Sequence, residues 1–253
     1  MLAEERRNRI LELLKENRFV SVNELHDGLR VSRETIRRDI NRLASENRLI
    51  KTHGGAQSVN KEEPAFAERM DANVEAKRAI GRKAAELVPD GATVIIDSGT
   101  TCLCTAEALS ERLGLTIITN DIHVASTLTG RNDNRVLLLG GEVIAGESAT
   151  MGHDTTAMLS NYLADFSFIG ISSISDNGML SDYTRAAAEM RGAMIAQAHM
   201  PILIGDHDKF GWSARVRIQG IEKVSRVITD RKPDPAIVKS LKLHDIDLVV
   251  AHS

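Results

Sequence analysis

The hydrophobic positions of the N-terminal region follow the 3.6-residue period of short amphipathic helices. Residues 6–17 carry apolar side chains at helical spacing. Ser21 and Glu24 have the spacing of a capping box, which predicts that a second helix begins there. Residues 32–43 form a third helical segment, and residues 48–55 have the pattern of a strand that runs into a glycine turn. The order of these elements predicts a winged helix-turn-helix, in which the last helix enters the major groove of DNA.

The third helical segment carries arginines opposite its apolar stripe. Ile36, Ile40 and Leu43 share one side of the helix, so a small core can hold it while the polar side faces outward. Guanidinium groups on that side can bind guanine edges or phosphates. The residues that we expect to contact DNA lie on this helix and on the wing, and they are Ser32, Arg33, Thr35, Arg37, Arg38, Lys51 and His53. The alternative is a solvated helix face with ion pairs between residues i and i+4.

The distribution of charge favours DNA binding over a merely solvated face. Residues 1–55 carry 12 Lys and Arg against 9 Asp and Glu, a net charge of +3, whereas the whole chain has a net charge of −3. Residues 30–51 alone carry seven basic and three acidic side chains. Positive charge is therefore concentrated on the segment that is predicted to read DNA, and the remainder of the chain is acidic.

From residue 74 onward, short apolar runs alternate with helical segments. The runs are rich in Val, Ile and Leu without polar alternation, which is typical of strands buried on both faces of a sheet. They span residues 93–96, 115–118, 136–139, 166–171, 201–204, 224–228 and 247–250, and the helical segments span 74–88, 101–113, 122–128, 184–198 and 235–243. This alternation predicts an α/β domain with a largely parallel sheet. We expect the winged domain over residues 1–56, a linker over 57–70 and the α/β domain over 71–253, with less regular structure between 174 and 213.

Polar or glycine-rich segments follow several of the predicted strands. Ligands bind beyond the carboxyl ends of the strands in open α/β sheets, so these segments are the expected walls of a shared pocket. In the segment 97–101, Gly99 lets the backbone approach a ligand, and free N–H groups at a helix start suit a phosphate. Lys209 can supply a point charge to a phosphate, and Asp206 can accept from a sugar hydroxyl. The candidate pocket residues on these segments are Asp97, Ser98, Gly99, Thr100, Thr101, Asn120, Gly140, Gly141, Asp206 and Lys209.

Each of these residues also has a purely structural explanation. Side chains such as Asp97 and Asn120 can cap the helices that follow them. A tight turn alone can explain Gly140 and Gly141, and Lys209 can be an ordinary surface lysine. The recurrence of polar ends on several strands favours a shared pocket.

The chain resembles the DeoR family of transcriptional regulators. Residues at the spacing of the family's DNA-binding signature are Arg6, Ile10, Leu14, Ser32, Thr35, Ile36, Arg37, Arg38, Asp39 and Ile40, and residues 51–56 are similar to the end of the family's wing. Residues 97–101, 119–120, 139–142 and 206–211 are similar to the family's effector domain. The resemblance implies a fold similar to ribose-5-phosphate isomerase and CoA-transferase, and a sensor for a phosphorylated sugar or polyol. Residues 169–174, 180–183 and 205–211 are most similar to the glycerol-3-phosphate regulon branch.

The chain departs from the family pattern at an acidic-Ala-x-x-Lys motif. Ala187 stands in place of the first acid, and Arg191 stands in place of the lysine. Arg191 can still face a phosphate, so it joins the candidate effector-binding residues. The missing acid leaves the hydroxyl contacts of the effector open.

Other features exclude several classes of protein. No apolar run approaches the ~20 residues that cross a bilayer, and the N-terminus has no signal-peptide pattern, so we expect a soluble cytoplasmic protein with no membrane partner. Cys102 and Cys104 are too few and too close for a disulfide framework, and packing at a helix start is favoured over a metal site or a redox sensor. The sequence shows no pairing of a histidine with a carboxylate and no nucleophile constellation, so we expect no catalytic site, metal or cofactor.

These features together predict a DNA-binding repressor of a carbohydrate or polyol catabolic operon. A phosphorylated sugar or polyol is expected to release it from double-stranded operator DNA, with residues 57–68 and the helix at 74–88 as transmitters. One reading head gives limited affinity, so we expect a homo-oligomer, either a dimer or a tetramer. Two alternatives stay open. An isomerase-like enzyme could use Asp97, Asp206 and Lys209 in acid-base chemistry, and an activator of the same family differs only in the sign of regulation.

Overall fold

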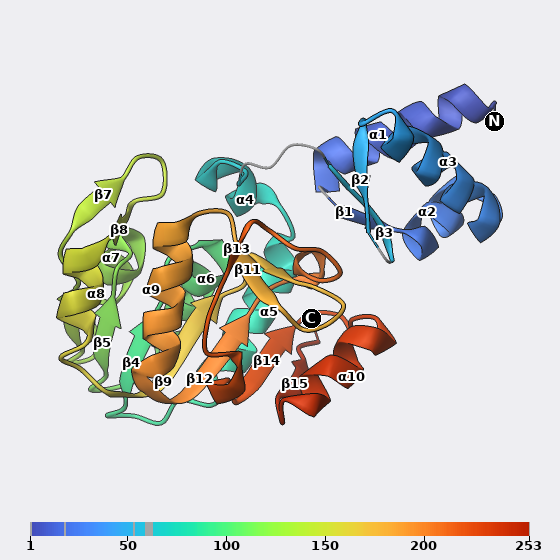
Figure 1. Ribbon diagram of the computed structural model, residues 1–253. Helices are drawn as coiled ribbons and strands as arrows, with labels where there is room; N and C mark the ends of the chain where they lie inside the picture. Colours follow the sequence, from blue (N-terminus) through green and yellow to red (C-terminus); the bar gives the residue numbers. More distant parts are fainter. Residues whose placement is uncertain (1, 18, 53, 59–62, 253) are drawn as a thin grey trace.

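The chain folds into a small N-terminal domain and a larger α/β domain, with a short helix between them (Figure 1). The computed structural model describes residues 2–17, 19–52, 54–58 and 63–252. Within these ranges, no helix has both the length and the apolar character that crossing a bilayer requires.

The N-terminal domain packs helices against a small antiparallel sheet. Its elements are α1 (Ala3–Asn17), β1 (Phe19–Ser21), α2 (Val22–Leu29), α3 (Arg33–Ser45), β2 (Leu49–Lys51) and β3 (Gly55–Ser58). The strand order β1-β3-β2 places β3 in the centre of the sheet. Helices α2 and α3 form the helix-turn-helix, and β2 and β3 form the wing, so the prediction of a winged helix-turn-helix is confirmed.

Local sequence signals account for the start of each reading helix. Ser21 Oγ accepts a hydrogen bond from the Glu24 amide at 3.1 Å, and Glu24 Oε2 accepts from the Ser21 amide at 2.7 Å, which completes the expected capping box. Ser32 Oγ accepts from the Thr35 amide at 3.1 Å and caps α3. The apolar stripe of α3 is fully buried at Ile36 and contributes to a separate core of the winged domain. Burying each such aliphatic side chain contributes about 1.5–3 kcal/mol.

The larger domain is built on a parallel sheet in the order β15-β14-β12-β9-β4-β5-β6. Its strands are β4 (Thr93–Ile96), β5 (Thr116–Thr119), β6 (Arg135–Leu138), β9 (Ala164–Gly170), β12 (Ala198–Ile204), β14 (Arg226–Thr229) and β15 (Asp247–Val250). Every predicted apolar run therefore lies in this sheet. Strand β12 begins at Ala198, three residues before the apolar run, because the exposed His199 interrupts the hydrophobic pattern there while the backbone already pairs with β9.

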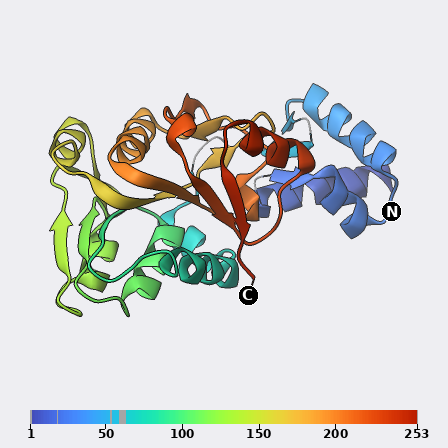
Figure 2. The same cartoon turned by 90° about the horizontal axis from the view of Figure 1, so that it is seen from below.

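Helices cover both faces of the sheet, as the view from below shows (Figure 2). One face packs against α5 (Val74–Ala85), α6 (Thr100–Leu109) and α7 (Ile122–Leu128), and the other packs against α8 (His153–Leu159), α9 (Arg185–Ala196) and α10 (Pro235–Leu243). Alternate residues of β4 enter the two cores, since Ile95 belongs to one and Ile96 to the other. Cys102 is buried in the core at the start of α6, as the packing interpretation predicted, and its burial raises the pKa of the thiol.

Additional short elements lie beside the main sheet. Strands β7 (Glu142–Ile144) and β8 (Ala149–Met151) form a hairpin that follows the edge strand β6. Strands β10 (Ser173–Ile174), β11 (Leu180–Asp182) and β13 (Val216–Arg217) form a small antiparallel sheet, and short turns of 3-10 helix lie at η1 (His207–Lys209) and η2 (Ile221–Lys223). The region 174–213 thus contains extra antiparallel strands and a 3-10 turn, as expected, together with the regular elements α9 and β12.

The segment between the domains is more structured than the expected linker. Strand β3 continues to Ser58, past the expected start of the linker at residue 57, and α4 (Phe66–Asp71) lies at the end of the segment. The Phe66 ring stacks on the His123 ring of α7 with centroids 5.3 Å apart. Lys77 Nζ of α5 donates hydrogen bonds to the carbonyl oxygens of Arg69 and Ala72 at the C-terminal end of α4. These contacts fix α4 on the larger domain, and the polar composition of the segment did not indicate them.

The winged domain lies against two loops of the larger domain. A Cβ built on Gly211 would lie 3.1 Å from the nearest ring atom of Phe19, and one built on Gly54 of the wing turn would lie 3.4 Å from Asp234 Oδ2. Gly211 also has a φ of +87°, which disfavours any other residue there. Both loops follow strands of the large sheet, so the reading head rests near the carboxyl ends of those strands.

Candidate DNA-binding surface and ligand cavity

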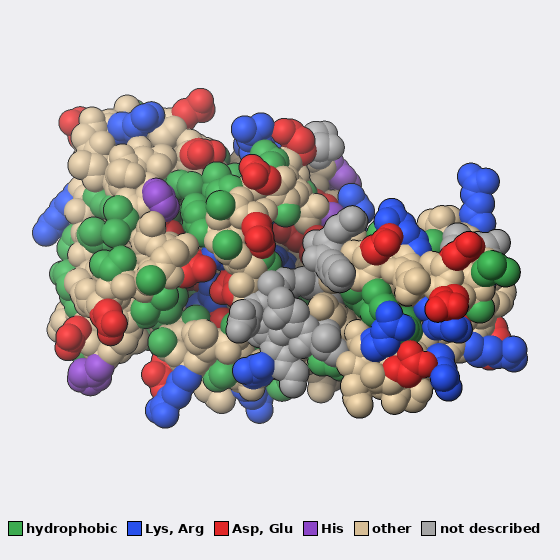
Figure 3. Space-filling model, turned by 90° about the horizontal axis from the view of Figure 1, so that it is seen from above, with side chains coloured by type: hydrophobic (Ala, Val, Ile, Leu, Met, Phe, Trp, Pro, Cys, Tyr) green, Lys and Arg blue, Asp and Glu red, His purple; other side chains and the backbone are tan. Residues whose placement is uncertain are grey.

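The arginines of α3 point away from the core of the winged domain. Arg33, Arg37 and Arg38 are exposed. Arg38 Nε donates to Glu34 Oε1 at 3.3 Å, and the Arg38 side chain is 78% exposed. Exposed pairs of this kind contribute at most about 1 kcal/mol, so a DNA phosphate can replace the carboxylate at little cost. Figure 3 shows Lys and Arg side chains spread over the winged domain with Asp and Glu among them.

The other residues predicted to contact DNA are Ser32, Thr35, Lys51 and His53, and two of them already have hydrogen-bond partners within the protein. Ser32 Oγ caps α3 and lies 2.9 Å from Thr35 Oγ1, so these hydroxyls already bind one another. Lys51 is exposed at the end of β2, next to the wing turn. His53 lies outside the described residues. The arrangement leaves the guanidinium groups of α3 as the main groups available to DNA.

A buried ion pair sets the position of α3. Arg6 Nε of α1 donates to Asp39 Oδ2 at 2.5 Å, and Arg7 Nη1 lies 3.8 Å from Asp39 Oδ1. The Asp39 side chain is 7% exposed. Arg6 and Asp39 belong to the family signature, but sequence reasoning did not predict that they pair, since they are 33 residues apart.

Polar segments after several strands meet at two neighbouring cavities in the larger domain. The smaller, of about 30 Å³, is lined by six of the predicted residues, which are Ser98, Gly99, Thr100, Thr101, Arg191 and Lys209. The larger, of about 410 Å³, shares Arg69, Thr100 and Lys209 with the smaller one and also contains Asp206. Figure 3 shows a hollow in the middle of the molecule with basic and acidic side chains together at its floor. The larger cavity also touches Leu14, Asn17 and Ser58, so it lies between the two domains.

The N-terminus of α6 opens onto the smaller cavity. Gly99 has a φ of +122°, a conformation that L side chains rarely adopt. In the described part of the chain, no side chain caps α6, and its first residues Thr100 and Thr101 line the cavity. Uncapped amides and the helix dipole together favour an anion at this position.

Asp97 does not cap α6, in contrast to the structural explanation offered by the sequence. Its carboxylate accepts hydrogen bonds from the amides of Ser98 at 2.8 Å and Gly170 at 3.1 Å, and from Arg191 Nε at 2.8 Å. Asp121 instead caps α7 and also accepts a bond from the Gly99 amide at 3.3 Å. Burial raises the pKa of Asp121, although these amide bonds act in the opposite direction. The backbone at Ser98 and Gly99 is therefore held by the carboxylates of Asp97 and Asp121.

Arg191 is buried between two carboxylates at the back of the smaller cavity. It pairs with Asp97 and with Asp182, and its Nη1 donates to Ser172 Oγ at 2.9 Å. The two carboxylates balance its charge. Burial would lower the pKa of Arg191, but the nearby acids, Asp97 first, raise it above its ordinary value. Arg191 thus lines the cavity as predicted, but its main contacts hold strands β4 and β11 to α9.

Lys77 is a cavity residue that sequence reasoning missed. It is 4% exposed and lines the larger cavity. Burial lowers the pKa of Lys77 and the charge of Lys209 adds to this effect, whereas Asp206 opposes it. A signal was present, because Lys77 precedes Ile80 and Ala84 by three and seven residues and so occupies the apolar stripe of α5. A lysine at such a position indicates a functional or structural partner inside the fold.

Four predicted pocket residues line neither cavity: Asp97, whose contacts are given above, and Asn120, Gly140 and Gly141. Asn120 Nδ2 donates to the Thr150 carbonyl at 2.9 Å. The Gly140 amide donates to Met158 Sδ at 3.4 Å, and a Cβ on Gly141 would lie 2.1 Å from Thr155 Oγ1. Asn120 and the two glycines hold the base of the β7–β8 hairpin against its neighbours, which agrees with the structural explanation for the glycines.

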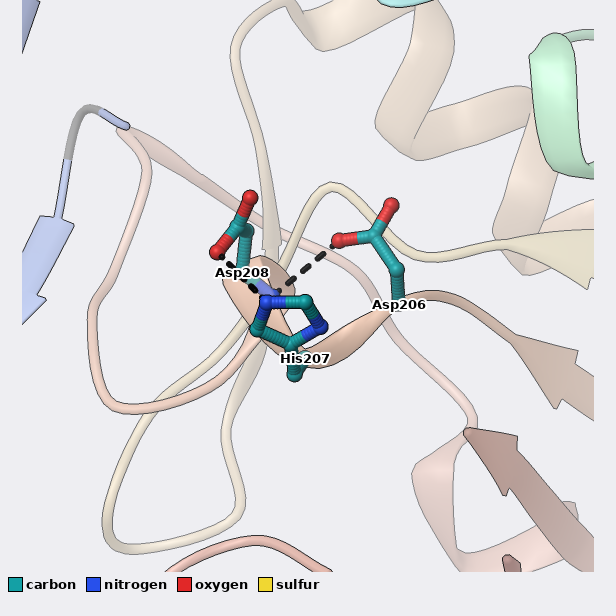
Figure 4. Close-up of side chains that lie close together, drawn as sticks. All are labelled: Asp206, His207 and Asp208. Atoms are coloured by element: carbon teal, nitrogen blue, oxygen red, sulfur yellow. Dashed lines mark hydrogen bonds and ion pairs between the residues drawn. The ribbon is translucent and has the colours of Figure 1, made fainter. Parts of the chain in front are cut away.

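Asp206, His207 and Asp208 converge at the η1 turn beside the larger cavity (Figure 4). Their potential ligand atoms lie within 4.8 Å of one another, which is close enough to consider a metal ion. However, His207 Nδ1 already forms a hydrogen bond with Asp230 Oδ2 at 2.8 Å, and Asp208 Oδ2 accepts from Asn73 Nδ2 at 2.7 Å. Because these groups have protein partners, we assign no metal to the cluster.

The pairing of His207 with Asp230 corrects the expectation that no histidine pairs with a carboxylate. The two residues follow β12 and β14, which are neighbours in the sheet although 23 residues separate the pair in sequence. The hydrogen bond that His207 donates to Asp230 raises the pKa of His207, against the effect of burial. Burial raises the pKa of Asp230, but its bonds to His207 outweigh this and lower it overall. The pair braces the turn that carries Lys209.

A winged helix-turn-helix joined to an α/β domain with cavities is the architecture of a transcriptional regulator. A family model of the DeoR-like helix-turn-helix domain matches residues 6–62, and a model of the DeoR C terminal sensor domain matches residues 72–231. The chain belongs to the DeoR family.

Relatives align with nearly the whole chain. The glycerol-3-phosphate regulon repressor of Escherichia coli is 37% identical over 248 residues, which cover 96% of this chain and 97% of the relative. The HTH-type transcriptional repressor GlcR of Bacillus subtilis is 32% identical over 252 residues, which cover 99% of this chain and 97% of the relative. These relatives are named transcriptional repressors, which places the chain among regulators rather than enzymes. Ribose 5-phosphate isomerase A of Methanocaldococcus jannaschii superposes with a TM-score of 0.41 and 15% identity over 55% of each chain.

Proposed function

We propose that the protein is a repressor that binds operator DNA through α3 and the wing and is released by a phosphorylated sugar or polyol. The observation that carries the effector part of this proposal is the uncapped N-terminus of α6, which faces a cavity lined by Lys209. An amide cradle and a lysine together suit a phosphate better than any neutral ligand.

The phosphate would occupy the smaller cavity. There, the amides at the start of α6, the hydroxyls of Thr100 and Thr101 and the ammonium group of Lys209 offer donors. The carbon chain and its hydroxyl groups would extend into the larger cavity, where Asp206 and Lys77 are available. The buried ammonium group of Lys77 also gains from a nearby anion, because burial disfavours its charge.

The relatives support a small polyol phosphate as the first ligand to test. One of them is named a glycerol-3-phosphate regulon repressor, and it aligns with this chain from end to end. Its name describes that protein, and we extend the ligand class to this chain by analogy with the cavity. Named repressors among the relatives favour repression over activation.

Release from DNA requires that the effector prefer a different placement of the reading head. A tenfold loss of operator affinity corresponds to roughly 1.4 kcal/mol of coupling free energy. The larger cavity touches both domains at Ser58 and Lys77, so a ligand there can favour one placement of the winged domain over another.

We also expect self-association on operator repeats. Strand β6 is an edge of the sheet, and apolar side chains at and beside it are exposed, namely Ile122, Leu138 and Val143. Exposed apolar groups at a sheet edge favour contact with another copy. Light scattering on the purified protein, free and bound to DNA, measures the subunit number.

Isomerase chemistry has little support at this site. Asp97 is surrounded by the amides of Ser98 and Gly170 and by Arg191, so its carboxylate has a structural task. A general base needs a free acceptor within reach of a substrate proton.

A thermal-shift titration tests the proposed effector. A ligand that binds only the folded state stabilises it by RT ln(1 + [L]/Kd), about 2.7 kcal/mol at one hundred times Kd. Glycerol-3-phosphate, ribose-5-phosphate and inorganic phosphate are compared with glycerol and ribose. We expect a rise in Tm with phosphorylated compounds alone. A protein that responds to none of them, or equally to glycerol, does not sense a phosphorylated ligand here.

A further inference from the structure

Arg69 of α4 lines both cavities, and Glu68 of the same helix also lines the larger one. The Arg69 guanidinium pairs with Glu63 at 2.8 Å and with Glu147 in the β7–β8 turn. It also lies over the Phe66 ring, with Cζ 5.6 Å from the centroid. Only 11% of the Arg69 side chain is exposed. The helix that leads from the wing into the larger domain is therefore fastened to the β7–β8 hairpin by a nearly buried cation beside the ligand space.

Arg69 keeps an unsatisfied donor in this arrangement. Its Nε is buried and has no hydrogen-bond partner among the described residues. A buried donor without a partner costs about 1–3 kcal/mol, so an acceptor that reaches it is strongly favoured. The guanidinium fork matches the oxygens of a phosphate. The same residue lines the smaller cavity, where the start of α6 and Lys209 already favour an anion.

We infer that Arg69 is a further phosphate-binding residue of the effector site and that the ligand releases α4 by taking Arg69 from Glu147. This inference rests on the proposed function. It adds a residue of the segment between the domains to the effector site. It also explains how ligand binding at that site can affect the winged domain.

The state of Glu147 explains why the exchange has a structural effect. Burial raises the pKa of Glu147, and Arg69 acts against this increase. Without Arg69, the half-buried carboxylate must take up a proton or turn toward water. Either change loosens the β7–β8 turn from α4. Lys77 and the stacking of Phe66 on His123 would then hold α4 alone.

The inferred movement reaches the DNA-binding domain through the chain itself. Strand β3 ends at Ser58 and α4 begins at Phe66, so few residues separate the wing from Arg69. Leu14, Ser58 and Arg69 also line the same larger cavity. A ligand that repositions Arg69 thus changes the surface on which the winged domain rests.

Ligand affinity in matched variants tests the inference. Trp212, the only tryptophan of the chain, lines the larger cavity and reports binding by its fluorescence. Glycerol-3-phosphate is titrated into the full chain and into Arg69→Gln, Arg69→Lys, Glu147→Gln, Lys209→Ala and the control Arg78→Gln, an exposed arginine of α5. We expect Arg69→Gln to weaken binding about tenfold, Arg69→Lys to weaken it less, and Glu147→Gln to strengthen it.

A double variant separates ligand binding from a purely structural role. In Arg69→Gln/Glu147→Gln the gain from Glu147→Gln should vanish, because no guanidinium remains to be released. If Lys209→Ala loses binding while Arg69→Gln binds normally, the inference is wrong and the proposed function stands. If the unsubstituted protein binds neither glycerol-3-phosphate nor inorganic phosphate, the proposed effector is wrong and this inference falls with it. Melting temperatures of all variants identify any that fail to fold.

Discussion

Arg6 Nε of the first helix donates a hydrogen bond to Asp39 Oδ2 of the recognition helix at 2.5 Å. Both side chains are largely withdrawn from water. The polar surface of α3 presents its arginines to solvent only if the helix keeps its rotation about its own axis. The ion pair holds that rotation from the buried side of α3, away from its exposed arginines.

Replacement of Asp39 by Ala is expected to destabilise the winged domain by about 3 kcal/mol, because it leaves the buried charge of Arg6 without a partner. Hydrogen exchange of the α3 amides in the full chain measures the loss. Asp27→Ala, at an exposed acid of α2, is the control and should have little effect. The double variant Arg6→Met/Asp39→Leu should recover most of the stability. Equal protection of α3 in Asp39→Ala and the control contradicts this account.

Replacement of Arg38 by Ala is expected to weaken operator binding by about 1–3 kcal/mol without a change in folding, because Arg38 is exposed and makes only a weak pair with Glu34. Gel-shift titrations at two salt concentrations decide its role. If Arg38 contacts a phosphate, its loss lowers the slope of log affinity against log salt concentration by about one. If Arg38 contacts a base, its loss relaxes the sequence preference. Arg185→Ala removes an equally exposed arginine from the far domain and should bind DNA normally. Unchanged affinity of Arg38→Ala removes this residue from the interface.

Replacement of Lys209 by Ala is expected to leave operator affinity intact and to abolish release by the effector. Lys209 lines both cavities, and no ion pair holds it among the residues whose structure is described. The readout is DNA release on addition of glycerol-3-phosphate. Lys239→Ala, at an exposed lysine of α10, is the matched control. Normal induction of Lys209→Ala would place the effector elsewhere.

The pair of His207 and Asp230 predicts a pH-dependent contribution to stability. The pKa of His207 is raised, so the stability that its charge contributes is fully present below the ordinary pKa of 6.5. That contribution is lost as pH rises through the folded-state pKa. The pKa of Asp230 is lowered, so the stability that its charge contributes is fully present above the ordinary pKa of 3.8. That contribution is lost as pH falls through the folded-state pKa. The difference in Tm between the natural chain and His207→Gln should therefore shrink from about pH 6 to about pH 8. A constant difference across that range shows that the pair adds nothing.

Local signals in the sequence predicted most of the architecture. The bounds of α7 and α10 and those of β15 agree with their predicted segments, because each combines a clear apolar pattern with a distinct end. Helix α4 escaped prediction since none of its residues is buried to the extent of a core position, and its contacts are made through Phe66 and Arg69.

The site was predicted only where its residues are close in sequence. Residues 98–101 reach the cavity together because they share one strand-to-helix turn. By contrast, Arg69 pairs with Glu147 over 78 residues and Arg191 with Asp97 over 94 residues. Such partners follow from how α4, α9 and the β7–β8 hairpin pack beside the sheet, and the spacing of residues along the chain does not contain that packing. Asn120 shows the reverse error, since it follows a strand as expected but turns toward Thr150.

Strand β3 is both the middle strand of the wing sheet and the last element before the chain enters the sensor domain. Of its two neighbours in the sheet, β1 leads into α2 and β2 follows α3. Because β3 pairs with both neighbours, a displacement of its end would move the winged domain as a rigid body. In an assembly of such modules, a ligand that displaced the end of β3 would change the spacing and tilt of neighbouring heads without altering the surface that each presents to DNA.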